Sequence, residues 1–298
     1  MPEFHFHHPG PFLKPLCLQA KQAHLHKGIR MRDPLTVLIG DARERLREIT
    51  RGVQLVVTSP PYDDIRTYGG IEWTWETFTT IANELYRVLA PGGVLCWNVN
   101  DATTDGSETV TSCKQKIYFR EACGFLIHDT MIYAKSNGSK PNPRRYNQVF
   151  EYIFVLSKGR PSTVNLIRDK PNVTAGKAVF GKHTMREKDG SMTVRNNRIV
   201  AAEFGVRGNV WHGNTRGQEE VCRALPHPAM MPKWLARDLI ASFSNPGDVV
   251  LDPMAGGFTT CVAALELGRR AIGIEINPEY CELGRQQCAA VTPPLIAA

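Results

Sequence analysis

The segment Thr-Ser-Pro-Pro-Tyr at residues 58–62 places the hydroxyl groups of Ser59 and Tyr62 on either side of a rigid stop in the chain. It follows a short apolar run that is typical of a buried strand. The two prolines lack the amide hydrogen that a sheet ladder needs, so the strand must end between Ser59 and Tyr62. The simpler interpretation is a strand-ending turn without chemistry. Asp63 and Asp64 are the nearest carboxylates, and we interpret them as loop residues rather than a general base.

A second stretch with chemical potential is Leu-Asp-Pro-Met-Ala-Gly-Gly-Phe-Thr-Thr at residues 251–260. A strand ends at Asp252, a glycine-rich turn follows, and a helix begins at Thr259. The next strand ends at Glu275, where a carboxylate can accept hydrogen bonds from ribose hydroxyls. Glycines let the backbone approach a ligand, and a helix N-terminus offers unpaired N–H groups. This pattern indicates a nucleoside-cofactor site; the alternative is an ordinary loop whose acid caps a strand.

Positive charge is concentrated in the middle of the chain. Residues 135–216 contain sixteen Lys and Arg against five Asp and Glu, a net charge of +11, whereas the remainder of the chain carries −4. A segment with so large an excess of positive charge favours a polyanionic partner over an insertion that is merely solvated. The sequence therefore predicts nucleic-acid binding.

Length and composition restrict the class of protein. A chain of 298 residues suits one large α/β domain or a domain with an insertion. No apolar run reaches the eighteen residues of a membrane-spanning helix, and residues 1–32 lack the pattern of a signal peptide, so we expect a loose leader there. Met31 is a possible natural start.

Cysteines and histidines indicate neither disulfides nor a metal centre. The eight cysteines are scattered without a Cys-x-x-Cys pair, and several lie in apolar runs, which favours free thiols in a reducing, cytoplasmic compartment. The histidines at positions 5, 7 and 8 have no matching cysteine or acid nearby. We therefore expect no metal.

The pattern of apolar runs predicts an α/β fold with a mainly parallel sheet covered by helices. Strands are expected at 35–40, 54–59, 94–99, 125–133, 149–157, 248–252 and 271–275. Helices are expected after residue 41, at 75–89 with Pro-Gly-Gly at 91–93 as its stop, around 111–123, and at 232–243, 259–267 and 278–290. The strands at 125–133 and 149–157 are expected to form an antiparallel pair at one edge, and no long element is predicted between 161 and 216.

Four segments in a consistent order resemble the beta class of S-adenosylmethionine-dependent DNA amino-methyltransferases. Residues 58–62 match the catalytic motif of that family, and residues 251–260 resemble its cofactor loop. Residues 227–250 resemble the helix motif before that loop, and residues 39–46 resemble the segment that helps to hold the adenine of the cofactor. The catalytic motif comes first, the basic segment lies in the middle and the cofactor loop comes last, which is the permuted order of the beta class.

This resemblance implies a Rossmann-like methyltransferase fold with helices on both faces of the sheet. It assigns residues 33–160 and 217–298 to a catalytic domain and 161–216 to a target-recognition region. It also implies that S-adenosyl-L-methionine is the cofactor. The residues expected to bind it are Asp41, Thr58, His227, Pro228, Asp252, Pro253, Met254, Ala255, Gly256, Thr259, Thr260, Glu275 and Asn277.

The catalytic residues that the resemblance implies are Ser59, Pro60, Pro61 and Tyr62. The Ser59 side chain and the Pro60 carbonyl would accept hydrogen bonds from the amino group of a flipped base, and Tyr62 would stack on its ring. Serine at position 59 usually accompanies cytosine-N4 methylation in this family. The expected partner is double-stranded DNA, with a possible restriction endonuclease that acts on the same site; the enzyme would be a monomer or a homodimer.

Two positions depart from the usual family pattern. Phe258 stands where a small residue is common, so its side chain either enters the core or reshapes the cofactor rim. Met231 stands where a lysine is frequent. In the target-recognition region, Lys and Arg are expected on phosphates, the candidates for base contacts are Asn196, Asn197 and Gln218, and Trp211 is expected to be a packing anchor.

Three other functions remain open from the sequence alone. An adenine-N6 methyltransferase would use the same chemistry. An enzyme acting on RNA or on a protein glutamine could share the Pro-Pro-Tyr motif, although the permuted order and the basic insertion argue against it. A non-catalytic DNA-binding module is disfavoured because the catalytic motif, Asp252 and Glu275 are all present.

Overall fold

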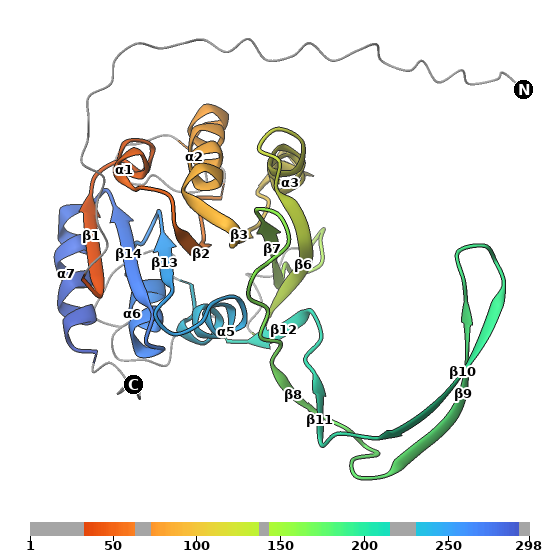
Figure 1. The fold of residues 1–298 in the computed structure, drawn as a ribbon. Coiled ribbons are helices and arrows are strands. Elements are labelled where there is room, and N and C mark those ends of the chain that lie inside the picture. Colours follow the sequence, from red (N-terminus) through yellow and green to blue (C-terminus); the bar gives the residue numbers. More distant parts are fainter. Residues whose placement is uncertain (1–32, 63–72, 137–142, 215–230, 292–298) are drawn as a thin grey trace, which may run out of the picture.

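The structure is a computed structural model that describes residues 33–62, 73–136, 143–214 and 231–291, with only the backbone described at 179–183 and 195–199. Eight strands form one central sheet in the order β1-β14-β13-β2-β3-β7-β6-β12 (Figure 1). They are β1 (Leu35–Ile39), β2 (Val53–Thr58), β3 (Leu89–Val99), β6 (Leu126–Lys135), β7 (Phe150–Ser157), β12 (Val210–Gly213), β13 (Val249–Asp252) and β14 (Arg270–Glu275). Only β7 runs antiparallel to its neighbours.

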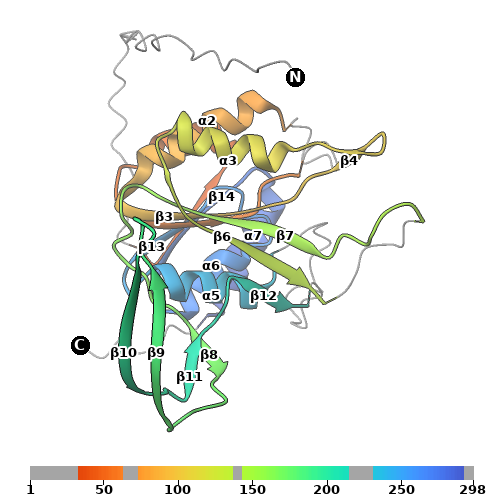
Figure 2. The ribbon, with the colours of Figure 1, turned by 90° about the vertical axis from the view of Figure 1, so that its right-hand side faces the viewer.

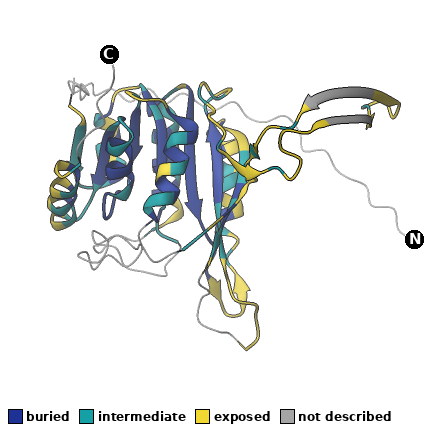
Figure 3. Cartoon of the chain, turned by 90° about the horizontal axis from the view of Figure 1, so that it is seen from below, coloured by how far each residue is buried: buried dark blue, intermediate teal, exposed yellow. Residues whose placement is uncertain are grey.

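Helices cover both faces of this sheet, which confirms the predicted fold class. One face carries α1 (Ala42–Glu48), α2 (Trp75–Val88) and α3 (Thr111–Glu121); the other carries α5 (Lys233–Phe243), α6 (Thr259–Glu266) and α7 (Pro278–Ala289). The central strands are therefore buried on both sides (Figure 3). Continuous Val, Ile and Leu runs suit such strands, because neither face has to meet water.

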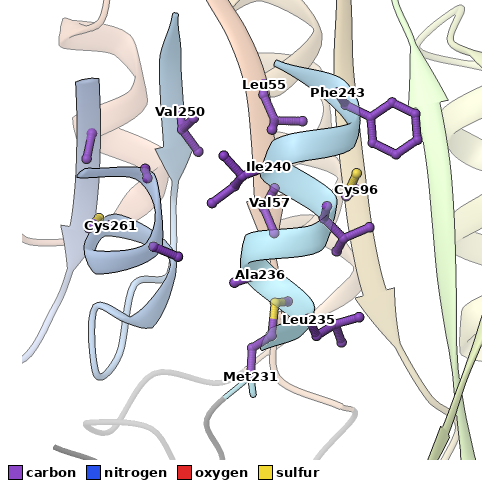
Figure 4. Close-up of a cluster of buried hydrophobic side chains, with 14 of the residues drawn as sticks. Leu55, Val57, Cys96, Met231, Leu235, Ala236, Ile240, Phe243, Val250 and Cys261 are labelled. Atoms are coloured by element: carbon purple, nitrogen blue, oxygen red, sulfur yellow. The ribbon is translucent and has the colours of Figure 1, made fainter. Parts of the chain in front are cut away.

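Successive residues of one strand enter opposite cores. Leu55 and Val57 of β2 pack under α5, whereas Val56 faces the cluster beneath α1 and α2. Figure 4 shows α5 running alongside β2 in front of the sheet, with Leu235 and Ile240 in the same buried cluster as Leu55 and Val57. The two-residue period of a strand thus fills both layers from a single apolar run.

The sheet contains a switch point between β2 and β13. These strands are parallel neighbours, but the chain leaves β2 through α2 to reach β3 on one side, and leaves β13 through α6 to reach β14 on the other. In open α/β sheets, ligands bind beyond the carboxyl ends of the strands at such a point. The first expectation for a site is therefore the edge where β2 and β13 end.

The region between residues 161 and 216 contains two further small sheets and the edge strand β12. Strand β8 (Arg168–Pro171) pairs with β11 (Phe204–Val206), and β9 (Ala178–Arg186) pairs antiparallel with β10 (Met192–Val200). Figures 1 and 2 show the β9–β10 hairpin projecting from the side of the molecule that carries α5 and β12. The sequence did not predict this hairpin, because its strands carry charged and polar residues on both faces instead of an alternating apolar pattern.

Two other predictions need correction. Helix α2 ends at Val88, and the Pro-Gly-Gly segment at 91–93 lies inside β3, not in a stop between helix and strand. The pairing of β3 with β2 changes register across this segment, so it forms an irregularity in the strand. The antiparallel pair β6–β7 is confirmed, but β12 lies outside it and forms the edge of the sheet. A minor hairpin joins β4 (Thr103–Thr104) to β5 (Ser107–Glu108).

Phe258 enters the core, which decides between the two alternatives that the sequence left. Its side chain is fully buried, and its backbone adopts the left-handed region at φ +58°. The ring fills space left by two glycines: a Cβ at Gly273 of β14 or at Gly284 of α7 would lie 2.5 or 2.2 Å from a ring atom. The Phe258 side chain, directly after the glycine-rich turn, therefore packs between α6, β14 and α7.

We predict that Gly284→Ala lowers the free energy of unfolding. The helix gains about 0.5–1 kcal/mol from alanine, but the clash with Phe258 costs about 1–3 kcal/mol, so the net effect is destabilising. Urea unfolding measures it. Gly208→Ala is the control, because nothing lies within 4 Å of its added methyl group. Equal stability of Gly284→Ala and wild type would contradict the packing described for Phe258.

Candidate active site

A buried hydrogen bond joins the catalytic motif to the cofactor loop at the switch point. Thr58, the last residue of β2, donates its hydroxyl proton to Asp252 Oδ1 over 2.8 Å. Thr58 is fully buried and Asp252 is 5% exposed. Since Ser59 follows directly, this bond ties the position of the catalytic segment to the end of β13.

Asp252 is a carboxyl group whose ionisation is opposed by its surroundings. Burial raises its pKa to about 6, and the negative charge of Glu275 acts in the same direction. Hydrogen bonds from Thr58, Thr260 and the Met254 N–H work against this rise. The buried carboxyl group is therefore held by three hydrogen-bond donors.

Glu275 organises the glycine-rich turn. Its two carboxylate oxygens accept the N–H groups of Gly256, at 2.8 Å, and Asn277, at 2.9 Å. The Ala255 N–H donates to the Ile274 carbonyl, so the turn lies against the end of β14. Helix α6 begins at this turn without a side-chain cap, because Phe258 occupies its N-cap position. The turn thus presents a helix N-terminus beside a fixed carboxylate, a combination that fits a nucleoside cofactor with an acidic end and ribose hydroxyls.

Two of the predicted cofactor residues already serve as helix caps. Asp41 caps α1 and binds the Arg43 guanidinium, which lowers the pKa of the Asp41 carboxyl, chiefly through that side-chain hydrogen bond. Asn277 caps α7 by accepting the Glu279 N–H at 2.8 Å. Both residues follow the carboxyl ends of neighbouring strands, β1 and β14, at the same edge as Asp252.

Ser59 and Tyr62 belong to a polar cluster formed by four strands or their ends. Ser59 Oγ lies 2.9 Å from Tyr62 Oη, and Tyr62 Oη donates to Glu151 Oε2 over 2.9 Å. Asn98 Nδ2 donates to both Tyr62 Oη and Glu151 Oε2, at 3.0 and 2.6 Å. Lys135 Nζ lies 2.6 Å from Glu151 Oε1. The tyrosine ring itself packs against the core beneath α2.

The sequence analysis missed Asn98, Glu151 and Lys135. Strand β7 runs antiparallel to its neighbours β3 and β6, so it begins at the edge of the sheet where they end. This brings Glu151, near the start of β7, to the catalytic motif. A signal did exist: Asn98 and Glu151 are polar residues within otherwise apolar strands, and buried polar groups need partners.

The structure brings most predicted site residues to one edge of the sheet. They are Asp41, Thr58, Ser59, Pro60, Pro61, Tyr62, Asp252, Pro253, Met254, Ala255, Gly256, Thr259, Thr260, Glu275 and Asn277. His227 and Pro228 lie outside the described residues, as do the carboxylates at 63 and 64. The roles assigned to these residues stay predictions.

Arg207 of the basic segment is engaged within the protein. Arg207 forms ion pairs with Asp169 and Asp238 and lies over the Trp211 ring. Trp211 is 6% exposed and belongs to the core, as predicted for a packing anchor. The side chains of Asn196 and Asn197 are not described, and Gln218 lies outside the described residues. The base contacts therefore stay predictions.

Among the described residues, no helix has both the length and the apolar character needed to cross a membrane. The same residues contain no group of three or more His, Cys, Asp or Glu side chains arranged for a metal ion. Their six cysteines are free, and five of them are buried.

Comparison with curated proteins identifies close relatives. The chain is 44% identical over 237 residues to the orphan methyltransferase M.BamHII of Bacillus amyloliquefaciens, a match that covers 79% of this chain and 88% of that protein. It is 28% identical to the DNA adenine methyltransferase YhdJ of Escherichia coli, with 84% of this chain and 81% of the relative covered.

Solved structures show the same fold. The PvuII DNA methyltransferase, described as cytosine-N4-specific, superposes with a TM-score of 0.63 at 19% identity and covers 89% of this chain and 90% of its own. A DNA modification methylase of Thermus thermophilus complexed with S-adenosyl-L-methionine gives a TM-score of 0.53 at 26% identity, covering 85% and 94%.

The family model described as DNA methylase matches residues 53–286. This range includes the catalytic motif, the basic segment, the cofactor loop and Glu275. The chain belongs to the N6/N4 DNA methylase family and is an S-adenosylmethionine-dependent DNA methyltransferase.

Proposed function

We propose that this enzyme methylates the exocyclic N4 amino group of a cytosine flipped out of duplex DNA. The observation that carries the proposal is the serine hydroxyl of the catalytic motif, held beside the cofactor loop by the Thr58–Asp252 bond. Adenine-N6 methylation is the alternative with the same chemistry.

The target amine is a weak nucleophile because its lone pair is delocalised into the ring. Hydrogen-bond acceptors at its two protons shift the nitrogen toward sp³ character and free that lone pair for attack. Ser59 Oγ and the Pro60 carbonyl supply these acceptors, and the adjacent prolines keep them in place before the base arrives. When bound, S-adenosylmethionine would supply the electrophilic methyl group and keep the electron pair of the broken S–C bond as a thioether. The proton that the methylated amine loses passes to water. The Tyr62 ring orients the flipped base.

The cofactor is held by the turn at the end of β13 and the acid at the end of β14. Glu275 keeps lone pairs for ribose hydroxyls while two backbone N–H groups fix its orientation. The uncapped N–H groups of α6 favour the carboxylate end of the cofactor. His227 and Pro228 are assigned to the same site on the sequence motif alone.

The choice of cytosine rests on the serine at position 59 and on the fold shared with a protein described as cytosine-N4-specific. The relative YhdJ, described as a DNA adenine methyltransferase, supports the alternative. Membership of the family supports a proposed role in restriction–modification, with a cognate endonuclease that acts on the same site without a stable complex. The free and mostly buried cysteines support a reducing, cytoplasmic location.

Residues 161–216 form the proposed target-recognition region. The β9–β10 hairpin projects from the catalytic domain as a two-stranded ribbon rich in Lys and Arg, a shape and charge suited to a DNA groove (Figure 2). Arg207 does not serve as a phosphate ligand in this proposal, because it is engaged by two aspartates.

We predict that duplex DNA treated with this enzyme contains N4-methylcytosine. Plasmid from a host that expresses the protein is digested to nucleosides and measured by mass spectrometry, with Ser59→Ala as the inactive control. N6-methyladenine without N4-methylcytosine would select the alternative. Transfer of labelled methyl to RNA or protein, and not to duplex DNA, would refute both.

We predict that removing the hairpin separates DNA binding from cofactor binding. Residues 178–200 are replaced by Asn-Gly, since Lys177 and Ala201 already close the base of the ladder through an Ala201 N–H to Lys177 carbonyl bond of 3.1 Å. Duplex affinity should fall about tenfold or more, and its dependence on salt should become shallower. S-adenosylmethionine binding by calorimetry should be unchanged. Unchanged DNA affinity would remove the hairpin from the recognition region.

We predict that Asp252 makes stability depend on pH. Its pKa is raised to about 6 in the folded protein and is about 4 in the unfolded chain. Its contribution is therefore full below pH 4 and is lost as the pH rises through 6. The free energy of unfolding of wild type relative to Asp252→Asn should fall by about 1–3 kcal/mol between pH 4 and 7. Urea unfolding at both pH values measures this difference; a constant difference would contradict the raised pKa.

A further inference from the structure

The hydrogen bonds around Tyr62 determine which way the Ser59 hydroxyl points. A tyrosine hydroxyl has one proton, and that of Tyr62 is donated to Glu151 Oε2. The bond of 2.9 Å between Ser59 Oγ and Tyr62 Oη must therefore use the serine proton. Ser59 is thus a donor toward Tyr62, and only its lone pairs are available to a substrate.

Asn98 supports this arrangement. Its amide nitrogen donates to both Tyr62 Oη and Glu151 Oε2. Turning the amide over would place its oxygen against the Glu151 carboxylate oxygen, two acceptors with no proton between them, so the network itself assigns the orientation. The cost is visible: Asn98 Oδ1 is buried without a hydrogen-bond partner among the described residues. The bonds to a charged carboxylate, which are the stronger ones, outweigh that cost.

The Glu151 carboxylate, which accepts the hydrogen bond from Tyr62, is itself held by an ion pair. Lys135 Nζ lies 2.6 Å from Glu151 Oε1, and the two side chains are 20% and 13% exposed. The chain of groups runs from Lys135 on β6 through Glu151 on β7 to Tyr62 and Ser59 after β2, with Asn98 on β3 as its support. The Ser59 and Tyr62 hydroxyls both donate in the direction of Glu151, and Lys135 and Asn98 donate to the same carboxylate from the other sides.

We propose that Glu151, acting through Tyr62, is a positioning residue that makes Ser59 an obligate hydrogen-bond acceptor, so that the site selects a base with an exocyclic amino group over one with a carbonyl. This inference rests on the proposed function of Ser59. An amino group donates to the serine lone pairs. The O4 of uracil or thymine, or the O6 of hypoxanthine, would meet those lone pairs with its own. A site built for a donor rejects the analogue that lacks it far more strongly than an apolar pocket would.

The test compares binding of duplexes that differ in one group. After the methylated position has been mapped, cytosine or uracil is placed there, opposite an abasic site so that neither base is paired. If the methylated base proves to be adenine, the pair is adenine and hypoxanthine. Wild type should prefer the amino base by about tenfold or more. Tyr62→Phe and Glu151→Gln should each reduce that preference to within about threefold, since both free the serine hydroxyl to donate.

Turnover provides a second readout. Each variant should lower kcat by about 10- to 100-fold while changing KM for DNA less than threefold, because the acceptor matters most as the amine attacks. The double variant Tyr62→Phe/Glu151→Gln should be no slower than Tyr62→Phe alone, since Glu151 acts through the tyrosine hydroxyl. Glu121→Gln is the matched control: it makes the same substitution at an exposed position of α3 and should change neither readout.

Cofactor binding and thermal unfolding show whether each variant is folded, and Tyr62→Phe retains the ring that packs against the core. Wild-type preference in both variants, or equal binding of the two bases by wild type, would overturn the inference while leaving methyl transfer intact. Failure of wild type to methylate any duplex would refute the proposed function, and this inference with it.

Discussion

The hydrogen bond between Thr58 and Asp252 is the interaction on which the site depends. It lies between the two strands whose crossovers diverge, and therefore where the segment after β2 meets the turn after β13. Both groups are buried, so a break would leave a buried carboxyl with one donor fewer. The position of Ser59 relative to the glycine-rich turn follows from this contact.

Around that contact, the two halves of the edge have different chemistry. On the side of β13, β14 and β1, carboxylates are satisfied mainly by backbone N–H groups and a neighbouring arginine, which shapes loops into a cradle. On the side of β2, β3 and β7, side chains bind one another in a directed chain. The first arrangement suits a cofactor with many polar groups. The second suits the amino group of a base, which needs a hydrogen-bond acceptor for its proton.

Much of the fold was predictable because its signals are local. Apolar runs bounded by turns gave nearly every strand of the central sheet, and helical spacing gave α2 and α5 to within two residues. The glycine-rich turn and its distant acid could be found because spacing along a βαβ unit is set by the unit itself. The β9–β10 hairpin could not, since a ribbon that packs on little needs no apolar face. The Pro-Gly-Gly segment was wrongly predicted to be a helix stop, because its residues are typical of one although it lies within a strand.

By itself, the sequence determined the fold class and the order of the motifs, because each motif is written in contiguous residues with fixed local geometry. The catalytic role of residues 58–62 and the cofactor role of residues 251–260 stay proposals. Only the tertiary structure decided that Phe258 fills the space over two glycines, that Arg207 is engaged within the protein, and that Glu151 and Asn98 surround Tyr62. These facts depend on sheet order and on one antiparallel strand. Residues 36 and 89 positions away from Tyr62 become its partners, and no periodicity in the sequence marks such distances.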